Sequence, residues 1–250
     1  MSTEMKNPEL FVFEYGGTAR SGKGTIVSWL SEVHPEIATE ETGADYRAVT
    51  LGLLRQGELE LGMDEAHVAM VLKRIAIGSL TDLVARRKEL EADEGSDALY
   101  GADVNQTVHL VSPLESVRKA VKGGFAKRVE RVRDDDEHSV LLVDGRNLGP
   151  VVERVEGTTL VMRTFVTCLA FEAARRECLR AGLTPGTDEW HDAFGVNMDA
   201  IVARNNADQD RVLDPVVADA NAIDYWKNES LINATTHLYG QFLFEDDRTE

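Results

Sequence analysis

A glycine-rich run at residues 15–25, YGGTARSGKGT, constrains this chain more than any other feature. It follows residues 10–13, an aromatic and β-branched run typical of a buried strand, and precedes residues 26–30, whose apolar side chains have helical spacing. A phosphate-binding loop requires a strand, a glycine turn and a helix in this order, because backbone N–H groups and the helix N-terminus then face the anion. The run therefore predicts a nucleoside triphosphate site in which Lys23 reaches the outer phosphates.

The residue after the lysine departs from the strict form of this motif. Ser or Thr usually follows the lysine directly, whereas here Gly24 follows Lys23 and Thr25 comes one place later. The Gly-Lys-Gly-Thr form is found in nucleoside monophosphate kinases. This departure therefore favours that class among proteins with a phosphate-binding loop. A glycine turn without a ligand is the alternative, and the flanking strand and helix argue against it. The residues predicted to bind the nucleoside triphosphate are Gly17, Thr18, Ala19, Arg20, Ser21, Gly22, Lys23, Gly24 and Thr25.

Length and composition indicate one sizeable α/β domain with an inserted subdomain, because 250 residues that are 43% hydrophobic suffice for a packed core. The polar N-terminal segment, and the lack of a run of about eighteen apolar residues, predict a cytoplasmic protein without a membrane span. Cys168 and Cys178 have no histidine or cysteine partners at metal-ligand spacing, so we expect reduced residues of the core.

The formal net charge is −17, from 27 Lys and Arg against 44 Asp and Glu. Such a charge repels nucleic acids and anionic membranes at long range, so we expect neither as a partner. A nucleotide is also an anion and therefore needs a local cationic pocket. We expect small-molecule nucleotides as ligands and a monomeric protein.

The segment that follows the first helix predicts further helices and a small insert. One helix begins near Thr42 or Asp45, either of which could cap it, and carries Arg47 in its early turns, where an arginine either answers a bound anion or lies in solvent. A second helix begins at Asp64. Residues 79–104 break into short apolar pieces around an acidic loop, which predicts a small β-rich insert.

Residues 139–143 form a run typical of a buried strand, and the polar sequence Asp-Gly-Arg-Asn follows at 144–147. Ligands collect at the carboxyl ends of strands in parallel α/β sheets, so Asp144 and Arg146 fall where chemistry is expected. The remaining predicted elements are a helix from Pro113, strands at 158–166 and 222–226, and helices at 171–179 and 190–203. The last two helices, joined by a Gly/Pro turn, predict a mobile lid, with an exposed hairpin carrying surface ion pairs as the alternative.

Five blocks of the sequence resemble bacterial cytidylate kinases, within the nucleoside monophosphate kinases, in the order and spacing of that family. They are residues 17–25, 42–47 (TGADYR), 116–118 (SVR), 144–149 (DGRNLG) and the Arg-x3-Asp-x2-Arg pattern of 204–211. The resemblance implies a three-layer α/β P-loop kinase fold with a central parallel sheet. It places the kinase core at 1–56 and 113–250, a small acceptor-binding insert at 57–112 and a helical lid at about 167–211.

The resemblance also implies ATP-dependent phosphoryl transfer to a pyrimidine nucleoside monophosphate, CMP or dCMP foremost, with Mg²⁺. Its catalytic residues would be Lys23, Arg146, Arg175 and Arg176. The acceptor's phosphate would lie on Arg47 and Arg146, its sugar on Arg204 and Asp208, and its base near Thr42, Arg118, Asn147 and Arg211. Thr25 would bind Mg²⁺, and Asp144 would contact the other ligands of the ion rather than the ion itself.

Two features depart from the family pattern. The family usually has Asp where Asn147 stands, and the segment before the Ser-Val-Arg block is shorter here. Because a carboxylate only accepts hydrogen bonds whereas an amide also donates, Asn147 is expected to relax or shift base choice toward uracil or thymine rings, as in UMP, dUMP or dTMP. The family's base-contacting serine has two candidates, His109 and Ser112.

Other interpretations stay open beside this one. A kinase for another small metabolite would need a single phosphate-clamping arginine rather than several spread over separate segments. A non-catalytic P-loop nucleotide-binding protein would keep the loop without transferring a phosphoryl group. The guanine-reading Asn-Lys-x-Asp motif is absent, which argues against a GTPase. The histidines are scattered without partners at motif spacing, as expected for a transfer that needs no strong general base.

Overall fold

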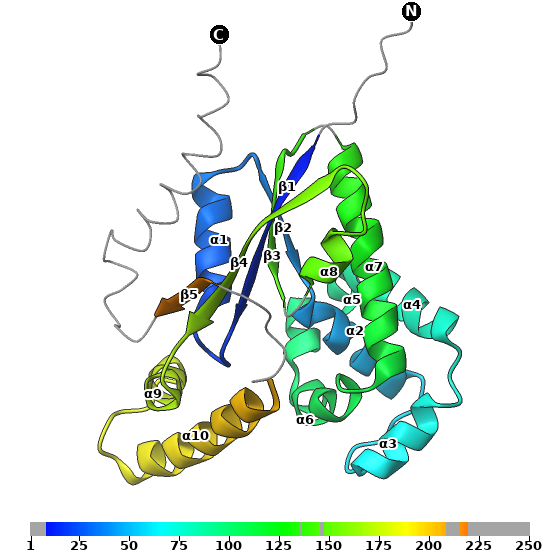
Figure 1. Ribbon diagram of the computed structural model, residues 1–250. Helices are drawn as coiled ribbons and strands as arrows, with labels where there is room; N and C mark the ends of the chain where they lie inside the picture. The colour runs from blue at the N-terminus through cyan, green and yellow to red at the C-terminus, as the bar shows by residue number, and fades with distance from the viewer. Residues whose placement is uncertain (1–8, 136, 146–147, 209–215, 220–250) are drawn as a thin grey trace, which may run out of the picture. The chain divides into compact units, whose positions relative to one another are not determined.

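The computed structural model describes residues 9–135, 137–145, 148–208 and 216–219 (Figure 1). These residues fall into two compact units. The first unit comprises residues 9–16 and 24–163, and the second comprises 17–23, 164–208 and 216–219.

The strands of the sheet are β1 (Leu10–Gly17), β2 (Ile37–Glu41), β3 (Val140–Asp144), β4 (Thr158–Thr167) and β5 (Val216–Asp219). Their order is β2-β3-β1-β4-β5. β1 and β2 both run parallel to β3, so that Phe13 and Thr39 each lie opposite Leu142. β4 and β5 also pair in parallel, beginning with Thr164 opposite Val216. The central parallel sheet expected from the sequence is confirmed.

Helices cover both faces of the sheet in the first unit. The helices of this unit are α1 (Lys23–Val33), α2 (Gly43–Arg55), α3 (Glu65–Leu72), α4 (Ile77–Ala85), α5 (Arg87–Glu94), α6 (Ala102–Val111), α7 (Glu115–Asp134) and α8 (Gly149–Val152), with a 3₁₀ turn η1 (Ser96–Tyr100). Figure 1 shows α1 on one face of β1 and β3 and α7 on the other. Helix, sheet and helix thus make the three layers that the sequence predicts.

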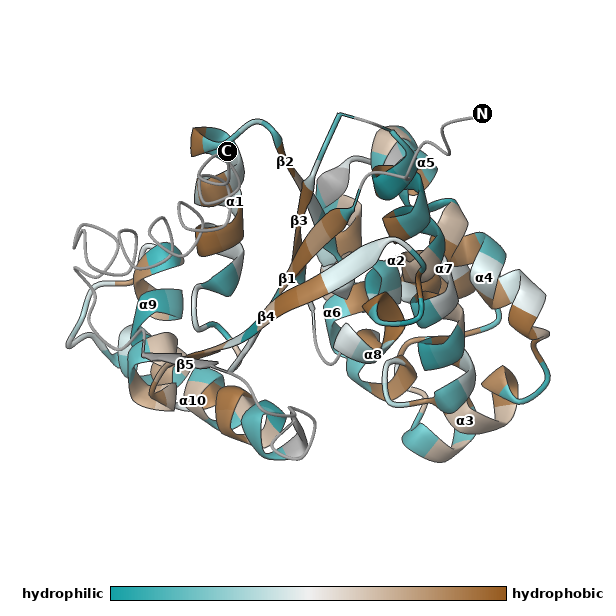
Figure 2. Cartoon of the chain, turned by 45° about the horizontal axis from the view of Figure 1, so that its top comes forward, coloured by the Kyte–Doolittle hydropathy of each residue, from teal (hydrophilic) through white to brown (hydrophobic). Residues whose placement is uncertain are grey.

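One core of this unit lies between the sheet and α7. Val12 of β1 and Leu141 and Val143 of β3 pack with Phe125 and Val129 of α7. Figure 2 shows hydrophobic residues along much of β1 and β3. Successive side chains of a strand point to opposite faces, so strands covered by helices on both sides must be apolar nearly throughout.

The segment expected to form a β-rich insert is helical, so that prediction is wrong. It contains α4, α5, η1 and the start of α6. Leu80, Leu83 and Val84 recur at intervals of three and four, and all pack into one cluster with residues of α2 and α7. The short apolar pieces therefore follow a helical period. Gly95, which has a φ of 84°, ends α5 and breaks the pattern.

Element boundaries differ from the sequence prediction at several places. Helix α7 begins at Glu115 rather than Pro113, and α10 extends to Asp208 rather than Ala203. Strand β2 was not predicted, because its alternation is obscured by Glu40 and Glu41 at its end. The strand predicted at residues 222–226 lies outside the described residues. The strands predicted near residues 10, 139 and 158 are confirmed.

The second unit is built around a pair of helices, α9 (Ala170–Arg180) and α10 (Asp188–Asp208). Ala173 and Ala174 of α9 form a small core with Ile201 of α10, and Ala19 of the glycine-rich run joins it. Trp190 stacks on Phe194 with ring centroids 4.8 Å apart. Cys168 and Cys178 are buried and form no disulfide, as expected. Across the described part of the chain, every helix is too short or too polar to cross a lipid bilayer.

Candidate active site

The glycine-rich run forms a turn that is fixed against the end of β4 in the second unit. Thr18 donates its backbone N–H to the carbonyl of Val166 at 3.0 Å, and Cys168 donates its N–H to the hydroxyl of Thr18 at 3.0 Å. A Cβ on Gly17 would lie 2.6 Å from the Val166 carbonyl oxygen, so only glycine fits there. Arg20 and Gly22 have φ angles of 59° and 95°. These left-handed residues turn the chain sharply before α1 begins at Lys23.

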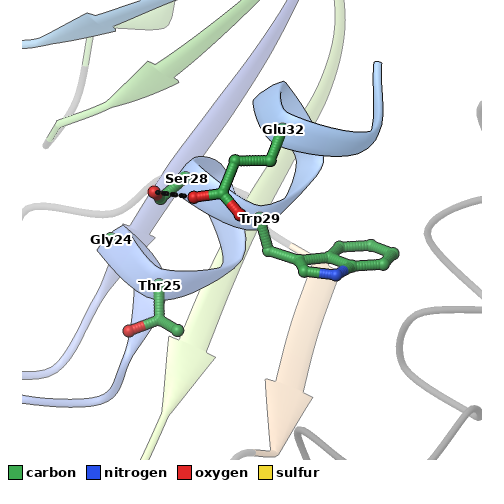
Figure 3. A pocket seen from close by; sticks show the side chains of 5 residues that line it. All are labelled: Gly24, Thr25, Ser28, Trp29 and Glu32. Atoms are coloured by element: carbon green, nitrogen blue, oxygen red, sulfur yellow. Dashed lines mark hydrogen bonds between the residues drawn. The ribbon is translucent and has the colours of Figure 1, made fainter. Parts of the chain in front are cut away.

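The first turn of α1 lies beside the carboxylate that ends β3. A Cβ on Gly24 would lie 3.5 Å from Oδ2 of Asp144, and Thr25 next to it is exposed. A shallow hollow of about 410 Å³ begins there and continues along α1 past Ser28, Trp29 and Glu32 (Figure 3). A hydroxyl and a carboxylate oxygen are ligands that suit Mg²⁺. Among the described residues, no cluster of three acidic, His or Cys side chains could hold a metal alone.

Two sequence blocks predicted to bind the acceptor meet at the carboxyl ends of β2 and β3. Thr42, the residue before α2, donates its N–H to the carbonyl of Asp144 at 3.1 Å. A Cβ on Gly145 would lie 2.8 Å from Oγ1 of Thr42 and 2.2 Å from Leu148, so the glycine permits this close approach. Thr42 precedes α2 as predicted, although its side chain makes no capping hydrogen bond. Both blocks therefore lie at the sheet edge where ligands of parallel α/β proteins bind.

A buried glutamate of β1 holds the chain just after the Asp-Gly-Arg block. Glu14 is 4% exposed and accepts hydrogen bonds from the N–H groups of Leu148 at 2.7 Å and Gly149 at 2.9 Å. Arg163 lies 3.7 Å from the same carboxylate. A Cβ on Gly149 would meet the Arg163 guanidinium at 2.3 Å. Sequence reasoning missed Glu14, because its partners lie more than a hundred residues away along the chain.

A second buried carboxylate, Asp45, is held between two guanidinium groups. Arg87 donates to Oδ1 at 3.2 Å and Arg128 to Oδ2 at 2.5 Å. Burial raises the pKa of Asp45 to about 6, although both arginines act in the opposite direction. Burial alone would lower the pKa of Arg128, but Asp45 and Glu40 raise it. Asp45 lies in the first turn of α2 and Thr42 is the N-cap, so of the two alternatives for the cap the one that names Asp45 is wrong.

Arg47, predicted to bind the acceptor phosphate, is held within the first unit by η1 and α6. It donates to Oδ1 of Asn105 at 2.6 Å and to the carbonyl of Leu99 at 3.3 Å. Its guanidinium also lies 4.6 Å from the ring centroid of Tyr100. Burial, together with the charge of Glu41, raises the pKa of the Tyr100 hydroxyl. Arg47 is therefore partly buried rather than in bulk solvent, and its binding of the acceptor phosphate stays a prediction.

Other predicted residues occupy both units. Arg118 on α7 donates to the carbonyl of Ser112 at 3.1 Å, so one candidate for the base-contacting position lies beside a predicted base-binding arginine. In the second unit, Arg175 and Arg176 both donate to the carboxylate of Glu172 at 3.0 Å. The i,i+3 and i,i+4 spacing on α9 explains this shared pairing.

The remaining predicted residues leave one question of geometry untested. Arg146, Asn147 and Arg211 lie outside the described residues, as does the side chain of Asp208. Arg47 and Arg204 belong to separate units. The predicted convergence of Arg47, Arg146, Arg204 and Arg211 in one cleft therefore stays a prediction.

A parallel α/β sheet with a glycine-rich phosphate loop between β1 and α1, and polar residues after β2 and β3, defines the class of P-loop kinase folds. The model of the family "Cytidylate kinase" matches residues 15–231. The chain therefore belongs to the cytidylate kinase family and is a nucleoside monophosphate kinase, a phosphotransferase.

Three individual cytidylate kinases are similar in sequence to this chain. A cytidylate kinase of Exiguobacterium sibiricum is 30% identical over 83% of this chain and 85% of that protein. One of Pseudomonas putida is 26% identical over 96% and 99%. One of Chlorobaculum tepidum is 31% identical, and the match spans 54% of this chain and about half (53%) of that relative. The crystal structure of TT1252 from Thermus thermophilus aligns with a TM-score of 0.44 and 16% identity, covering 92% of this chain and 98% of that one.

Proposed function

We propose that this chain transfers the γ-phosphoryl group of ATP to CMP or dCMP, giving the nucleoside diphosphate and ADP. The observation that carries the proposal is the turn at residues 17–23, fixed by Thr18 on the end of β4 and leading directly into α1, in a member of the cytidylate kinase family. Such a turn directs backbone N–H groups and a helix N-terminus at phosphate oxygens. Lys23 adds a positive charge at the same helix end.

The residues supply position and charge rather than covalent catalysis. In phosphoryl transfer the developing charge is spread over phosphate oxygens, so cationic side chains and loop amides stabilise the transition state. Lys23, Arg175 and Arg176 take this role toward the donor in our proposal. The acceptor is already an anion and needs no strong general base.

We propose that Mg²⁺ binds near Thr25 and Asp144, because Gly24, the residue before Thr25, lies against the Asp144 carboxylate. When bound, it would neutralise charge on the donor phosphates. In this proposal the hydroxyl of Thr25, an exposed residue, binds the ion, and Asp144 orients the water ligands of the ion.

For the acceptor, we propose that Arg47 and Arg146 bind the phosphate and that Arg204 and Asp208 bind the sugar. Thr42, Arg118, Asn147 and Arg211 are assigned to the base. The close packing of Thr42 on Gly145 supports the placement of this acceptor site at the carboxyl ends of β2 and β3. Action on free nucleotides, a monomeric state and a cytoplasmic location stay predictions.

Turnover of a panel of monophosphates tests the substrate. Wild-type protein with ATP and Mg²⁺ is assayed for ADP formation with CMP, dCMP, UMP, dUMP and dTMP. We expect the highest kcat/KM for CMP or dCMP, and detectable use of a uracil or thymine nucleotide that falls in Asn147→Asp, because a carboxylate cannot donate to a carbonyl oxygen. Strict cytosine preference, unchanged in Asn147→Asp, contradicts the role of Asn147. ADP formation that ignores every monophosphate contradicts the proposed function.

A further inference from the structure

The phosphate-binding turn contains a residue in a costly backbone conformation. Among the described residues, Arg20 is the non-glycine residue with a positive φ, at 59°. A left-handed conformation costs an L-residue about 1 kcal/mol or more, and it persists where surrounding contacts enforce it. The turn therefore needs contacts on or next to Arg20 that hold it in the conformation suited to phosphate.

The contacts of the Arg20 side chain contribute little to holding this backbone conformation. Its Nε lies 3.2 Å from a carboxylate oxygen of Glu177, but the Arg20 side chain is 52% exposed and Glu177 also pairs with Arg180. Ion pairs of this kind, exposed to solvent and shared, contribute little free energy.

The residue before Arg20 is held more firmly, by α10. Ala19 donates its backbone N–H to Oδ1 of Asn205 at 2.8 Å, a contact between residues 186 positions apart. The methyl group of Ala19 is buried in the core formed with Ala173, Ala174 and Ile201. Ile201 and Asn205 are four residues apart and so share a face of α10. One helix face thus packs against the Ala19 side chain and satisfies its N–H.

We propose that Asn205 is a positioning residue for the donor nucleotide. Through the N–H of Ala19 it fixes the turn at Arg20, so that the loop amides that follow are already oriented when ATP arrives. A loop ordered in advance binds its ligand more tightly, because less conformational entropy is lost on binding. Asn205 acts through Ala19 and is not assigned a contact with substrate. The inference rests on the proposed function insofar as the turn binds ATP phosphates.

Three substitutions at neighbouring positions separate this role from general destabilisation. Asn205→Ala removes the acceptor oxygen, whereas Asn205→Asp keeps it in the same place. Asn206→Ala is the matched control, since this next residue of α10 is exposed. Dissociation constants for ATP are measured by calorimetry without acceptor, together with the melting temperature and, in the assay, KM for ATP and for CMP.

We expect Asn205→Ala to weaken ATP binding about fivefold to tenfold, the loss of one hydrogen bond, with KM for CMP at saturating ATP unchanged. Asn205→Asp keeps the acceptor but adds a negative charge beside the phosphates, so it should melt closer to wild type than Asn205→Ala does, whereas Asn206→Ala should bind ATP as wild type does. ATP binding by Asn205→Ala as tight as wild type overturns the proposal. So does an Asp variant that melts no higher than the Ala variant, or an equal loss of ATP and CMP use.

The failure of this inference is distinguishable from failure of the proposed function. ATP binding is read without any acceptor, so it reports on Asn205 even if CMP is not the substrate. Wild-type protein that binds no ATP contradicts the proposed function itself.

Discussion

Glu14 stands out at the scale of single residues, because it is a carboxylate buried inside a strand and both of its oxygens accept hydrogen bonds. Glu14→Gln keeps the shape but replaces one oxygen by an NH₂ group that faces a donor. We expect the free energy of unfolding to fall by about 1 to 3 kcal/mol, since one buried N–H then lacks an acceptor. Urea denaturation measures this change in the free energy of unfolding. The exposed Glu58→Gln should change stability by less than about 0.5 kcal/mol, and an equal effect of both substitutions contradicts the assigned contacts.

Asp45 gives a prediction about pH. Its pKa is about 6 in the folded protein, above the ordinary value of 3.8, so the folded state binds the proton more tightly than the unfolded state. Its contribution to stability therefore grows as pH falls from about 6 to about 4 and is lost as pH rises through 6. The difference between the two pKa values corresponds to a change of at most about 3 kcal/mol in the free energy of unfolding.

The measurement for Asp45 compares wild type with Asp45→Asn by urea denaturation at pH 7 and pH 4.5. The difference in free energy of unfolding should shift in favour of wild type at the lower pH, because the variant cannot take up this proton. The same difference at both pH values contradicts a raised pKa.

Lys23 is the residue on which the proposed chemistry depends most. Lys23→Ala removes a positive charge from the start of α1, where the donor phosphates are proposed to lie. We expect kcat to fall on the order of 100-fold to 1,000-fold, comparable to removing one preorganised charge-stabilising group. Lys127→Ala, an exposed position of α7, serves as the control and should leave kcat unchanged. Near-normal turnover by Lys23→Ala contradicts the assignment.

Helix packing in the first unit depends on glycines that let α4 approach its neighbours. A Cβ on Gly124 of α7 would lie 2.5 Å from Cγ1 of Val84, and one on Gly52 of α2 would lie 2.4 Å from Leu83. Gly123, the adjacent residue of α7, has nothing within 4 Å of such a Cβ. The two glycines of α7 therefore form a matched pair for testing the contact between α4 and α7.

We expect Gly124→Ala to lower the free energy of unfolding by about 1 to 3 kcal/mol, because the β-branched Val84 cannot rotate away easily. Gly123→Ala should raise it by about 0.5 to 1 kcal/mol, since alanine favours the helix and meets no neighbour. Thermal or urea unfolding of both variants distinguishes these signs. Stabilisation by both substitutions would show that α4 and α7 do not pack as described.

Local sequence patterns predicted those elements whose signal is strong within a few residues. β1, β3 and β4 are apolar runs, and α9 has clear periodicity. β2 was missed because Glu40 and Glu41 interrupt its apolar pattern, yet pairing with β3 and the bond from Arg128 to Glu40 stabilise it. The short apolar pieces of residues 79–104 predict strands because α4, α5 and η1 are each short, and the core that α4 shares with α2 and α7 appears only in three dimensions.

The site was predictable only where its residues are marked by type and spacing. The glycines at 17, 22 and 24 and Lys23 form such a pattern, and so does the Asp144-Gly145 pair after β3. Glu14 and Asn205 belong to no recognisable motif. Each accepts a hydrogen bond from a backbone N–H group that lies 134 to 186 residues away along the chain. A contact of this kind depends on the fold and leaves no local pattern.

At the scale of the whole molecule, the net charge of −17 opposes the binding of any nucleotide, so the account requires local cations around the phosphate loop. Family membership, the phosphate loop and the paired blocks at β2 and β3 all support one activity. That activity is the central claim, and it has a direct chemical readout.

The most direct test follows ATP, ADP, CMP and CDP together by phosphorus NMR in a mixture of wild-type protein, ATP, CMP and Mg²⁺. The account predicts that ADP and CDP appear in equal amounts and that ADP does not accumulate when CMP is left out. ADP formed without CDP, or no turnover with any pyrimidine monophosphate, would contradict it.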